Sequence, residues 1–346
     1  MPLLDALEIV QAGGSLSREQ AAASIGKVLQ PGFDEDQLAL LLSLMAERGE
    51  SADEILGGAE AMRAAMTCFP SATECAVDTC GTGGDGLGSF NISSASALVA
   101  AAAGAFVVKH GNRSVSSSCG SADLFEAAGV DLQLSPAASE EVFQSCGIVF
   151  LYAPIYHPAM RHVAAVRARL KRRSLFNFLG PLCHPGNIRR QLLGIGTRVR
   201  LDDYASILQQ LGCTHGYVVH GFDGADELTL AGPNEVRVIG DAPFGTPAVS
   251  DLNGITLGFP LAQAKELEGG DVTVNLKLLT ELLDGKHGAI RNAVILNTAA
   301  TLLLAEVESD FSNAAERAAE AIDSGAAKTK LAQLVRVSQK LSGANT

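Results

Sequence analysis

The sequence predicts an α/β protein in which a helical small domain precedes a larger α/β domain with a mostly parallel central sheet. With 346 residues and 47% apolar content, the chain can bury one large core and one smaller one. The first 70 residues carry helix start and stop signals and nothing typical of strands. From Ala76 onward, short β-branched or apolar runs alternate with helical stretches, which is the pattern of βαβ units.

The helices of the first 70 residues are predicted from their ends. Ser17 with Gln20, and Ser51 with Glu54, have the spacing of capping boxes, in which two helix-terminal donors are satisfied reciprocally. Gly49 follows an apolar-periodic run and is a typical residue for ending a helix. We therefore expect residues 1–70 to form a helical domain.

The remaining elements follow in order along the chain. A basic, irregular stretch at about 155–190 interrupts the α/β alternation, and we expect it to be helical and to pack back onto the small domain. Residues 71–154 and 191–346 would form the larger domain. The strands expected there are 76–78, 106–108, 147–152 and 217–220, then a pair in 227–239 around the turn Gly232-Pro233-Asn234. Helices are expected at 94–103, 276–283, 291–305, 314–324 and 328–341.

Charge and hydropathy exclude several classes of function. A net charge of −12 offers no general attraction to nucleic acid or to an anionic membrane surface. The apolar run at 95–108 is shorter than the roughly 20 residues that span a bilayer. Asp5 and Glu8 interrupt the first apolar run, which argues against a signal peptide. We expect a cytoplasmic protein with small-molecule substrates, no nucleic-acid partner and no membrane.

A glycine-rich segment at 78–94 follows a predicted strand and opens a predicted helix. Glycine lets the backbone approach an anion closely, and the free N–H groups at a helix N-terminus favour phosphate. Asn91, Ser93 and Ser94 add polar side chains at this helix start. A flexible turn with ordinary helix caps is the alternative, but the strand before and the helix after favour a phosphate site.

Further polar clusters follow the other predicted strands. Lys109 begins one of them, His157 belongs to a second, and the adjacent carboxylates Asp226 and Glu227 belong to a third. Ligands bind past the carboxyl ends of strands in open α/β sheets, so one site can gather these groups. Taken singly, each is more simply explained as structural. Together they supply a phosphate loop, a cation and the hard oxygen ligands that Mg²⁺ prefers.

Five segments resemble, in order and spacing, the motif set of the anthranilate phosphoribosyltransferase family. They are GTGGDGLGSFNISS (81–94), KHGNRSVSSSCGSAD (109–123), APIYHPAM (153–160), the Arg167 region with FNFLGPL (176–182), and HGFDGADE (220–227). The segment QLALLLSLMAERGESADEI (37–55) also resembles that family's opening, so the resemblance covers most of the chain.

The resemblance implies a fold of the nucleoside phosphorylase and phosphoribosyltransferase type, a homodimer, and transfer of phosphoribose from phosphoribosyl pyrophosphate (PRPP) to anthranilate. It places Mg²⁺, with two ions per active site, on Ser93, Asp226 and Glu227. It assigns anthranilate to Gly81, His110, Asn112, Pro154, His157, Arg167 and Gly180. It assigns PRPP to Gly81, Gly84, Asp85, Ser89, Asn91, Ile92, Ser93, Ser94, Lys109, His110, Gly111, Asn112, Arg113, Ser114, Val115, Ser116, Ser117 and Ser121.

Some positions depart from the family pattern. Lys171 and Ser174 stand where the family usually has Gly and Thr, Cys183-His184 replaces Thr-Asn, and Ser118 replaces Lys or Arg. The departures spare the phosphate and metal groups but affect the expected anthranilate channel.

Two other functions stay open. A nucleoside phosphorylase has a related architecture, but it needs no acidic metal pair. A non-catalytic homologue that binds nucleic acid is disfavoured by the charge of −12.

Overall fold

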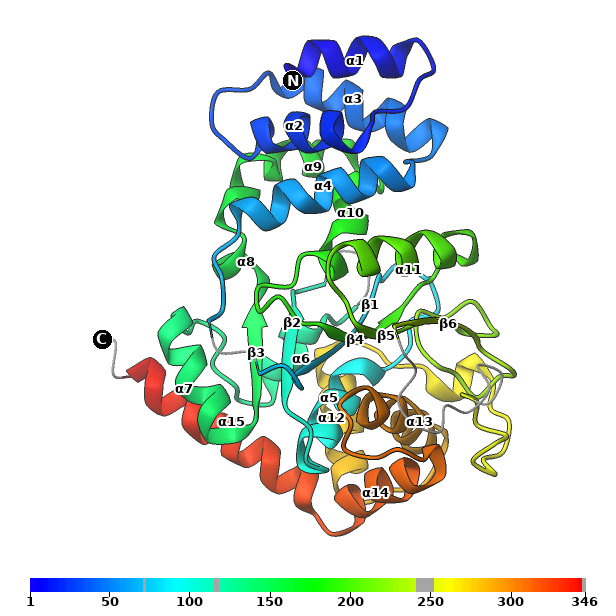
Figure 1. Ribbon diagram of the computed structural model, residues 1–346. Coiled ribbons are helices and arrows are strands. Elements are labelled where there is room, and N and C mark those ends of the chain that lie inside the picture. The colour runs from blue at the N-terminus through cyan, green and yellow to red at the C-terminus, as the bar shows by residue number, and fades with distance from the viewer. Residues whose placement is uncertain (71–72, 115–117, 241–251, 344–346) are drawn as a thin grey trace. The chain divides into compact units, whose positions relative to one another are not determined.

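The computed structural model describes residues 1–70, 73–114, 118–240 and 252–343, in two compact units (Figure 1). The helical unit comprises Met1–Cys68 and Pro154–Asn187, and the α/β unit comprises Phe69–Ala153 and Ile188–Thr346. Each unit is therefore built from two separate segments of the chain.

The helical unit has the predicted capped helices. Both capping boxes form, at Ser17 and at Ser51, and Gly49 ends the third helix at a φ of 89° that favours glycine. The second segment packs on the first, α9 against α3 and α10 against α4. The helices are α1 (Leu3–Gln11), α2 (Arg18–Val28), α3 (Glu35–Arg48), α4 (Ala52–Ala65), η1 (Pro158–His162), α9 (Ala164–Leu170), α10 (Leu175–Leu179) and η2 (Gly180–Leu182), with α8 (Ala153–Tyr156) at the boundary between the units.

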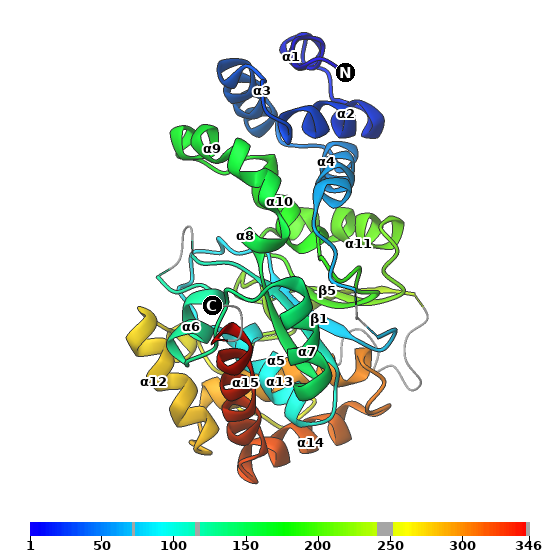
Figure 2. The same ribbon diagram turned by 90° about the vertical axis from the view of Figure 1, so that its left-hand side faces the viewer.

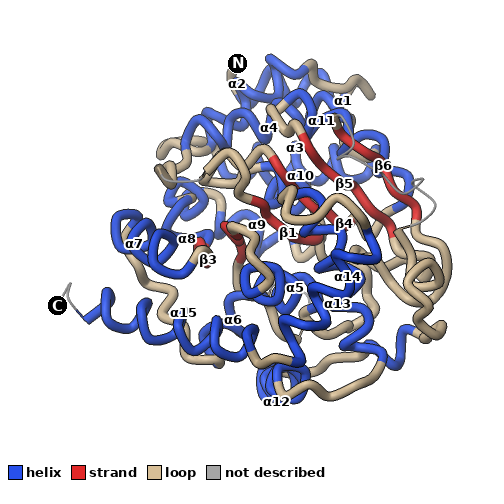
Figure 3. The backbone as a smooth tube through the Cα atoms, turned by 60° about the horizontal axis from the view of Figure 1, so that its bottom comes forward, coloured by secondary structure: helices blue, strands red, loops and turns tan. Residues whose placement is uncertain are grey.

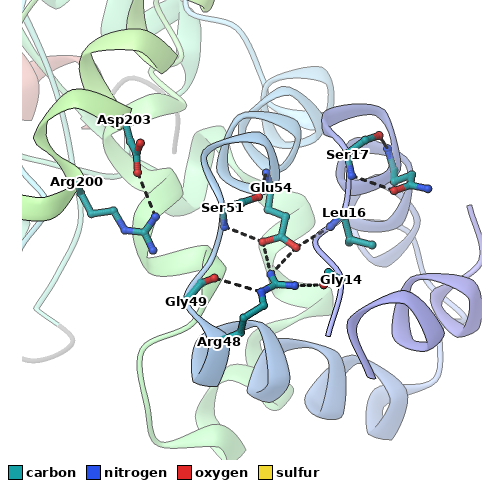
Figure 4. Close-up of polar contacts among 10 residues, drawn as sticks. Gly14, Leu16, Ser17, Arg48, Gly49, Ser51, Glu54, Arg200 and Asp203 are labelled. Carbon is teal, nitrogen blue, oxygen red and sulfur yellow. Dashed lines mark hydrogen bonds and ion pairs between the residues drawn. The ribbon is translucent and has the colours of Figure 1, made fainter. Parts of the chain in front are cut away.

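A buried carboxylate holds the start of α4 in place (Figure 4). Glu54 is 0% exposed, and its two oxygens accept hydrogen bonds from Arg48 Nη2 at 2.6 and 2.5 Å. The same oxygens accept from the backbone N–H of Leu16 at 2.9 Å and of Ser51 at 2.8 Å. Arg48 also donates to the Gly14 carbonyl. Glu54 is therefore satisfied by a cation and two N–H donors.

The α/β unit contains a six-stranded sheet in the order β3-β2-β1-β4-β5-β6 (Figure 3). The first five strands pair in parallel, and β6 pairs antiparallel with β5. Helices α5 and α13 cover one face, and α11 covers the other (Figure 1). The strands are β1 (Val77–Gly81), β2 (Val107–Gly111), β3 (Ile148–Tyr152), β4 (Arg190–Gly194), β5 (His215–His220) and β6 (Glu235–Ile239).

Helices α7 and α15 pack together beside β3 at one edge of the sheet (Figure 2). None of the helices in the described residues combines the length and hydropathy that a membrane crossing requires. The helical elements of this unit are α5 (Ile92–Ala102), α6 (Ser121–Ala127), α7 (Pro136–Cys146), η3 (Arg198–Arg200), α11 (Leu201–Gln210), η5 (Ala264–Leu267), α12 (Val272–Leu283), α13 (Ala289–Leu304), α14 (Phe311–Asp323) and α15 (Ala326–Gly343).

The predicted fold class is confirmed, but two strands are longer than predicted, one strand was missed, and one predicted strand is absent. Strands β1 and β2 each run three residues further than expected, so Gly81 and Gly111 end strands instead of following them. Strand β4 was missed, because its fully buried residues show no alternation of polar and apolar side chains. Residues 227–231 form no strand, since side-chain amides take up the backbone groups of Leu228 and Thr229.

Candidate active site

The glycine-rich segment leaves the end of β1 in a backbone conformation that favours glycine. Gly83, Gly84, Gly86 and Gly88 have φ values of 69°, 74°, 79° and 64°. The segment is anchored to the end of the neighbouring strand β4, where Thr82 N donates to the Gly194 carbonyl at 3.0 Å. The positive φ values, and not a lack of space for a Cβ at Gly83, Gly86 and Gly88, therefore require the glycines on the path between β1 and α5.

The carboxylates Asp226 and Glu227 bond directly to this segment. Asp226 Oδ2 accepts from Gly83 N at 2.6 Å, and Glu227 Oε1 accepts from Ser93 N in the first turn of α5 at 3.1 Å. Gly81 leaves the space that the Asp226 carboxylate occupies, because a Cβ there would overlap Asp226 Oδ2. The acidic pair, the glycine-rich loop and the N-terminus of α5 thus form one structure.

Burial shapes the electrostatics of the acidic pair. Removal from water, reinforced by the nearby charge of Asp85, raises the pKa of Asp226 to about 7. Removal from water and the charge of Asp226 raise the pKa of Glu227 to about 8, against a smaller opposing effect of Lys109. Two adjacent carboxylates that resist ionisation are poised to accept a divalent cation, which would offset both charges.

The donor set fits magnesium. Within residues 1–70, 73–114, 118–240 and 252–343, no group of three or more His, Cys, Asp and Glu side chains could hold a metal ion by itself. A cation on Asp226 and Glu227 would therefore complete its shell with the Ser93 hydroxyl, water or phosphate oxygens. Such incomplete, all-oxygen protein shells are typical of Mg²⁺ sites that bind phosphorylated substrates.

Lys109 is an internal cation and not a surface lysine. It is 2% exposed, and its Nζ donates to the Thr79 carbonyl at 2.6 Å and to Ser93 Oγ at 3.4 Å. It therefore braces the strand end beneath the glycine-rich loop. Among the other residues expected around PRPP, Ile92 and Ser94 are buried, and Ser89 forms a β-bridge with Glu268.

The segment after β2 is held by acidic side chains of α6. Arg113 forms ion pairs with Asp123 at 3.1 Å and Glu126 at 2.7 Å, and Asp123 also accepts from Ser114 N at 3.0 Å. The Asn112 carbonyl accepts a hydrogen bond from Ser121 Oγ at 3.4 Å. The expected site residues Val115, Ser116 and Ser117 lie outside the described residues.

The expected anthranilate residues divide between the units. His110 lies near the end of β2, Asn112 follows that strand, and Gly81 ends β1, all in the α/β unit. Arg167 belongs to the helical unit, where its guanidinium lies 5.8 Å from the Phe176 ring centroid. Three further residues also belong to the helical unit, namely Pro154 in α8, His157, and Gly180 at the start of η2.

Arg167 differs from its basic neighbours. Arg169 pairs with Asp36 at 2.9 Å and Arg172 with Glu47 at 3.1 Å, whereas no ion pair engages the Arg167 guanidinium in the described part of the chain. Burial lowers the pKa of Arg167. A half-buried guanidinium on an aromatic ring, with its donors uncommitted to a carboxylate, is suited to a planar anionic ligand.

The departures from the family pattern have structural roles within the helical unit. Lys171 ends α9 with a φ of 49°, and Ser174 caps α10 with a reciprocal contact to Asn177. Cys183 Sγ donates to the Ala59 carbonyl of α4 at 3.6 Å, and the buried His184 accepts from Gly186 N at 3.0 Å. Ser118, in the α/β unit, is exposed.

The sequence analysis missed a residue that supports the acidic pair. Asn297 in α13 is 0% exposed; its Oδ1 accepts from Leu228 N at 3.1 Å and its Nδ2 donates to the Leu228 carbonyl at 2.8 Å. It thereby fixes the backbone directly after Glu227. A single amide inside the apolar run ILNTAATLLL was the available signal, because a buried polar side chain needs partners.

The fold and the site define a glycosyl transferase with separate helical and α/β parts. The "Glycosyl transferase family, a/b domain" matches residues 73–328, and the "Glycosyl transferase family, helical bundle domain" matches residues 4–66.

Similar proteins show to which family of glycosyl transferases this chain belongs. Anthranilate phosphoribosyltransferase of Beijerinckia indica subsp. indica is 42% identical over 328 residues, covering 95% of each chain. The solved anthranilate phosphoribosyltransferase of Thermus thermophilus is 38% identical with a TM-score of 0.88, covering 97% of this chain and 99% of its own. The chain belongs to the anthranilate phosphoribosyltransferase family. The Saccharomyces cerevisiae enzyme in complex with PRPP and Mg has the same fold at 23% identity, a TM-score of 0.88 and 98% coverage of both chains.

Proposed function

We propose that the chain transfers the phosphoribosyl group of PRPP to anthranilate, giving N-(5-phosphoribosyl)anthranilate and pyrophosphate in tryptophan biosynthesis. One observation carries the proposal: Asp226 and Glu227 bond to Gly83 N and Ser93 N, so that the acidic pair and the phosphate-binding backbone are one unit. Relatives that are about 40% identical over nearly the full chain are named anthranilate phosphoribosyltransferase, which supports anthranilate as the acceptor.

The α/β unit would bind PRPP through backbone and hydroxyl donors. The turns at Gly83 and Gly84, whose glycines let the backbone come close to a ligand, and the N-terminus of α5 suit phosphate oxygens, because the helix dipole favours negative charge there. Ser93, Asp226 and Glu227 would hold Mg²⁺, which we propose as two ions per site. When bound, Mg²⁺ would offset the charge that pyrophosphate gains as it departs.

Arg167 would hold the anthranilate carboxylate. A guanidinium offers two parallel donors that match a planar two-oxygen acceptor, and the guanidinium of Arg167 lies over the Phe176 ring. His157 is suited to a passage for a neutral amine, because burial lowers its pKa to about 4 and keeps the ring uncharged at neutral pH. The resemblance adds Gly81, His110, Asn112, Pro154 and Gly180 to this set.

In this reaction the protein mainly has to position the two substrates, and it has little proton transfer to carry out. The aromatic amine of anthranilate is unprotonated at neutral pH, so no strong general base is needed. Holding the amine in line with carbon 1 of the ribose can lower the barrier by roughly 7–11 kcal/mol. We also propose that the protein acts as a homodimer in the cytoplasm.

The test is to mix protein, Mg²⁺, PRPP and anthranilate and to follow the loss of anthranilate fluorescence. The proposal predicts a loss that requires both PRPP and Mg²⁺. Unchanged fluorescence at every Mg²⁺ concentration would contradict it. Phosphorolysis of a pyrimidine nucleoside without Mg²⁺ would instead identify a phosphorylase.

A further inference from the structure

Asn275, in the second turn of α12, joins parts of the α/β unit that are far apart in the sequence. Its Oδ1 accepts from Gly270 N at 2.8 Å, and its Nδ2 donates to Asn91 Oδ1 at 2.8 Å. Asn91 Nδ2 in turn donates to the Cys119 carbonyl at 3.0 Å. Asn275 is 1% exposed, so water cannot easily replace these bonds.

The bonds fix the orientation of both side-chain amides. An asparagine can be turned over so that its oxygen and nitrogen exchange places, and its orientation is assigned from its partners. Here the two ends of the chain of bonds are backbone groups of opposite kind. Gly270 offers an N–H and Cys119 offers a carbonyl, so Asn275 must present its NH₂ to Asn91, and Asn91 must present its NH₂ to Cys119.

The backbone around Asn275 is shaped to admit this side chain. A Cβ at Gly269 would lie 2.6 Å from Asn275 Oδ1 and 2.9 Å from Phe90 Cα, closer than real Cβ contacts. Gly269 N also donates to the Gly88 carbonyl at 2.9 Å, so the segment before α12 runs directly along the glycine-rich loop. The space next to Phe90 therefore requires glycine at position 269 and a short amide side chain at position 275.

The contacts reach two segments that the proposed function assigns to PRPP. Asn91 ends the glycine-rich loop and occupies the N-cap position of α5, while Cys119 lies two residues before Ser121, at the end of the segment that begins at Lys109. We propose that Asn275 is a positioning residue for PRPP: it sets the amide orientation of Asn91 and holds both segments in register before the substrate binds. This inference rests on the proposed function, and its physical basis is that a prearranged site loses less entropy on binding.

The sharpest test is Asn275→Asp, which keeps the shape and replaces the NH₂ by an acceptor. Either two oxygens then face each other, or Asn91 turns over and presents its oxygen to the Cys119 carbonyl. We expect the KM and the calorimetric Kd for PRPP to rise roughly 10-fold or more. The KM for anthranilate should change less than about 2-fold.

Ser338→Ala is the matched control for a lost bond to loop backbone. Ser338 is 0% exposed, and its Oγ accepts from Asp131 N at 3.0 Å, away from the PRPP segments. It should lower the melting temperature and leave the Kd for PRPP unchanged.

A double-mutant cycle separates positioning from general structural support. If Asn275 acts through Asn91, then Asn91→Ala combined with Asn275→Ala should bind PRPP about as weakly as Asn91→Ala alone. Independent, additive losses would overturn the inference, as would a wild-type Kd in Asn275→Asp. Failure of the wild type itself to bind PRPP would overturn the proposed function instead.

Discussion

Buried acids in the two units show how differently a protein can treat the same chemical group. In the helical unit, Glu54 accepts from a guanidinium and from two backbone N–H groups. In the α/β unit, Asp226 and Glu227 lie next to each other, and burial together with like charge raises the pKa of both. The partners of Glu54 all come from the fold itself, whereas the partner that we propose for the acidic pair is a bound cation.

The comparison shows how a buried charged group with a structural role can be distinguished from one with a functional role. Removing an ionised group from water costs several kcal/mol unless a partner and further hydrogen bonds offset it. A fold gains nothing structurally from burying two like charges side by side, so such a pair is a candidate functional site, and we propose a cation as its partner. Lys109 offsets the charge of Glu227 only in part, because its effect on the pKa is smaller than those of burial and Asp226, and its ammonium donates to the Thr79 carbonyl and Ser93 Oγ.

Removal of the acidic pair should give the largest effect on activity. Asp226→Ala or Glu227→Ala should lower turnover by more than roughly 1000-fold, because the charge on the leaving group is no longer offset. Each variant should still fold with a similar melting temperature, because the loss of the hydrogen bond from Gly83 N or Ser93 N is offset by the removal of an unfavourable buried acid. Steady-state turnover across a Mg²⁺ titration, with thermal melting in parallel, measures both. Near-normal activity in either variant would show that the metal assignment is wrong.

Removing the cationic partner of Glu54 should have the opposite result: it should lower the stability of the protein and leave its activity unchanged. Arg48→Ala leaves Glu54 buried without its cation and should lower the free energy of unfolding by roughly 3–5 kcal/mol. Turnover per folded molecule should be preserved. Urea unfolding measures the loss, and adding Glu54→Ala to the same chain should recover part of it. An unchanged unfolding midpoint in Arg48→Ala would refute the structural role.

Arg167 tests the acceptor side of the proposal. Arg167→Ala should weaken anthranilate by roughly 1.5–3 kcal/mol, the worth of a hydrogen bond to a charged group, with the KM for PRPP nearly unchanged. Arg167→Lys should keep only part of the affinity for anthranilate, because an ammonium group lacks the two parallel donors of a guanidinium. Arg172→Ala, which removes a surface ion pair with Glu47, is the control. If the KM for anthranilate stays normal in Arg167→Ala, another group holds the carboxylate.

The smallest effect is on the pH dependence of stability. The raised pKa values of Asp226 and Glu227 mean that the folded protein binds more protons than the unfolded chain between about pH 4 and 8. Without metal, the contribution of the pair to stability should therefore fall between about pH 4 and 8. The part above about pH 6.5 lies outside the titration of His157, whose pKa falls from 6.5 to about 4 on burial.

Mg²⁺ should stabilise the protein more at the upper end of this range, because it binds the ionised pair. Melting curves of the wild type and Asp226→Asn, with and without Mg²⁺, measure this. A pH slope that is identical in both proteins would contradict the assignment to the acidic pair.

Local patterns predicted more of the molecule than long-range ones. The capping boxes at Ser17 and Ser51 were predicted from four-residue patterns, since both partners lie within one helical turn. The glycine-rich loop and the Asp226–Glu227 pair were also identified from local sequence. By contrast, the partners of Asn275 and Asn297 come from distant segments, which only the folded chain brings together.

Strand ends were the weakest predictions. The first two strands were expected to end at Asp78 and Val108, yet Gly81 and Gly111 still pair with neighbouring strands in the parallel sheet. Residues 227–231 had the composition of a strand, but Asn297 and Asn234 take up the backbone groups that a neighbouring strand would bind. Side-chain competition of this kind is decided by tertiary contacts.

Calorimetric titration of PRPP tests the central claim most directly, because it needs no acceptor and no turnover. Three proteins are compared with and without Mg²⁺: the wild type, Asp226→Asn and Arg48→Ala, the last at a temperature where it is folded. The acidic pair predicts Mg²⁺-dependent PRPP binding in the wild type and in Arg48→Ala, and the loss of that Mg²⁺ dependence in Asp226→Asn. Equal, Mg²⁺-dependent binding in all three proteins would contradict the claim that the buried pair of the α/β unit is completed by the metal.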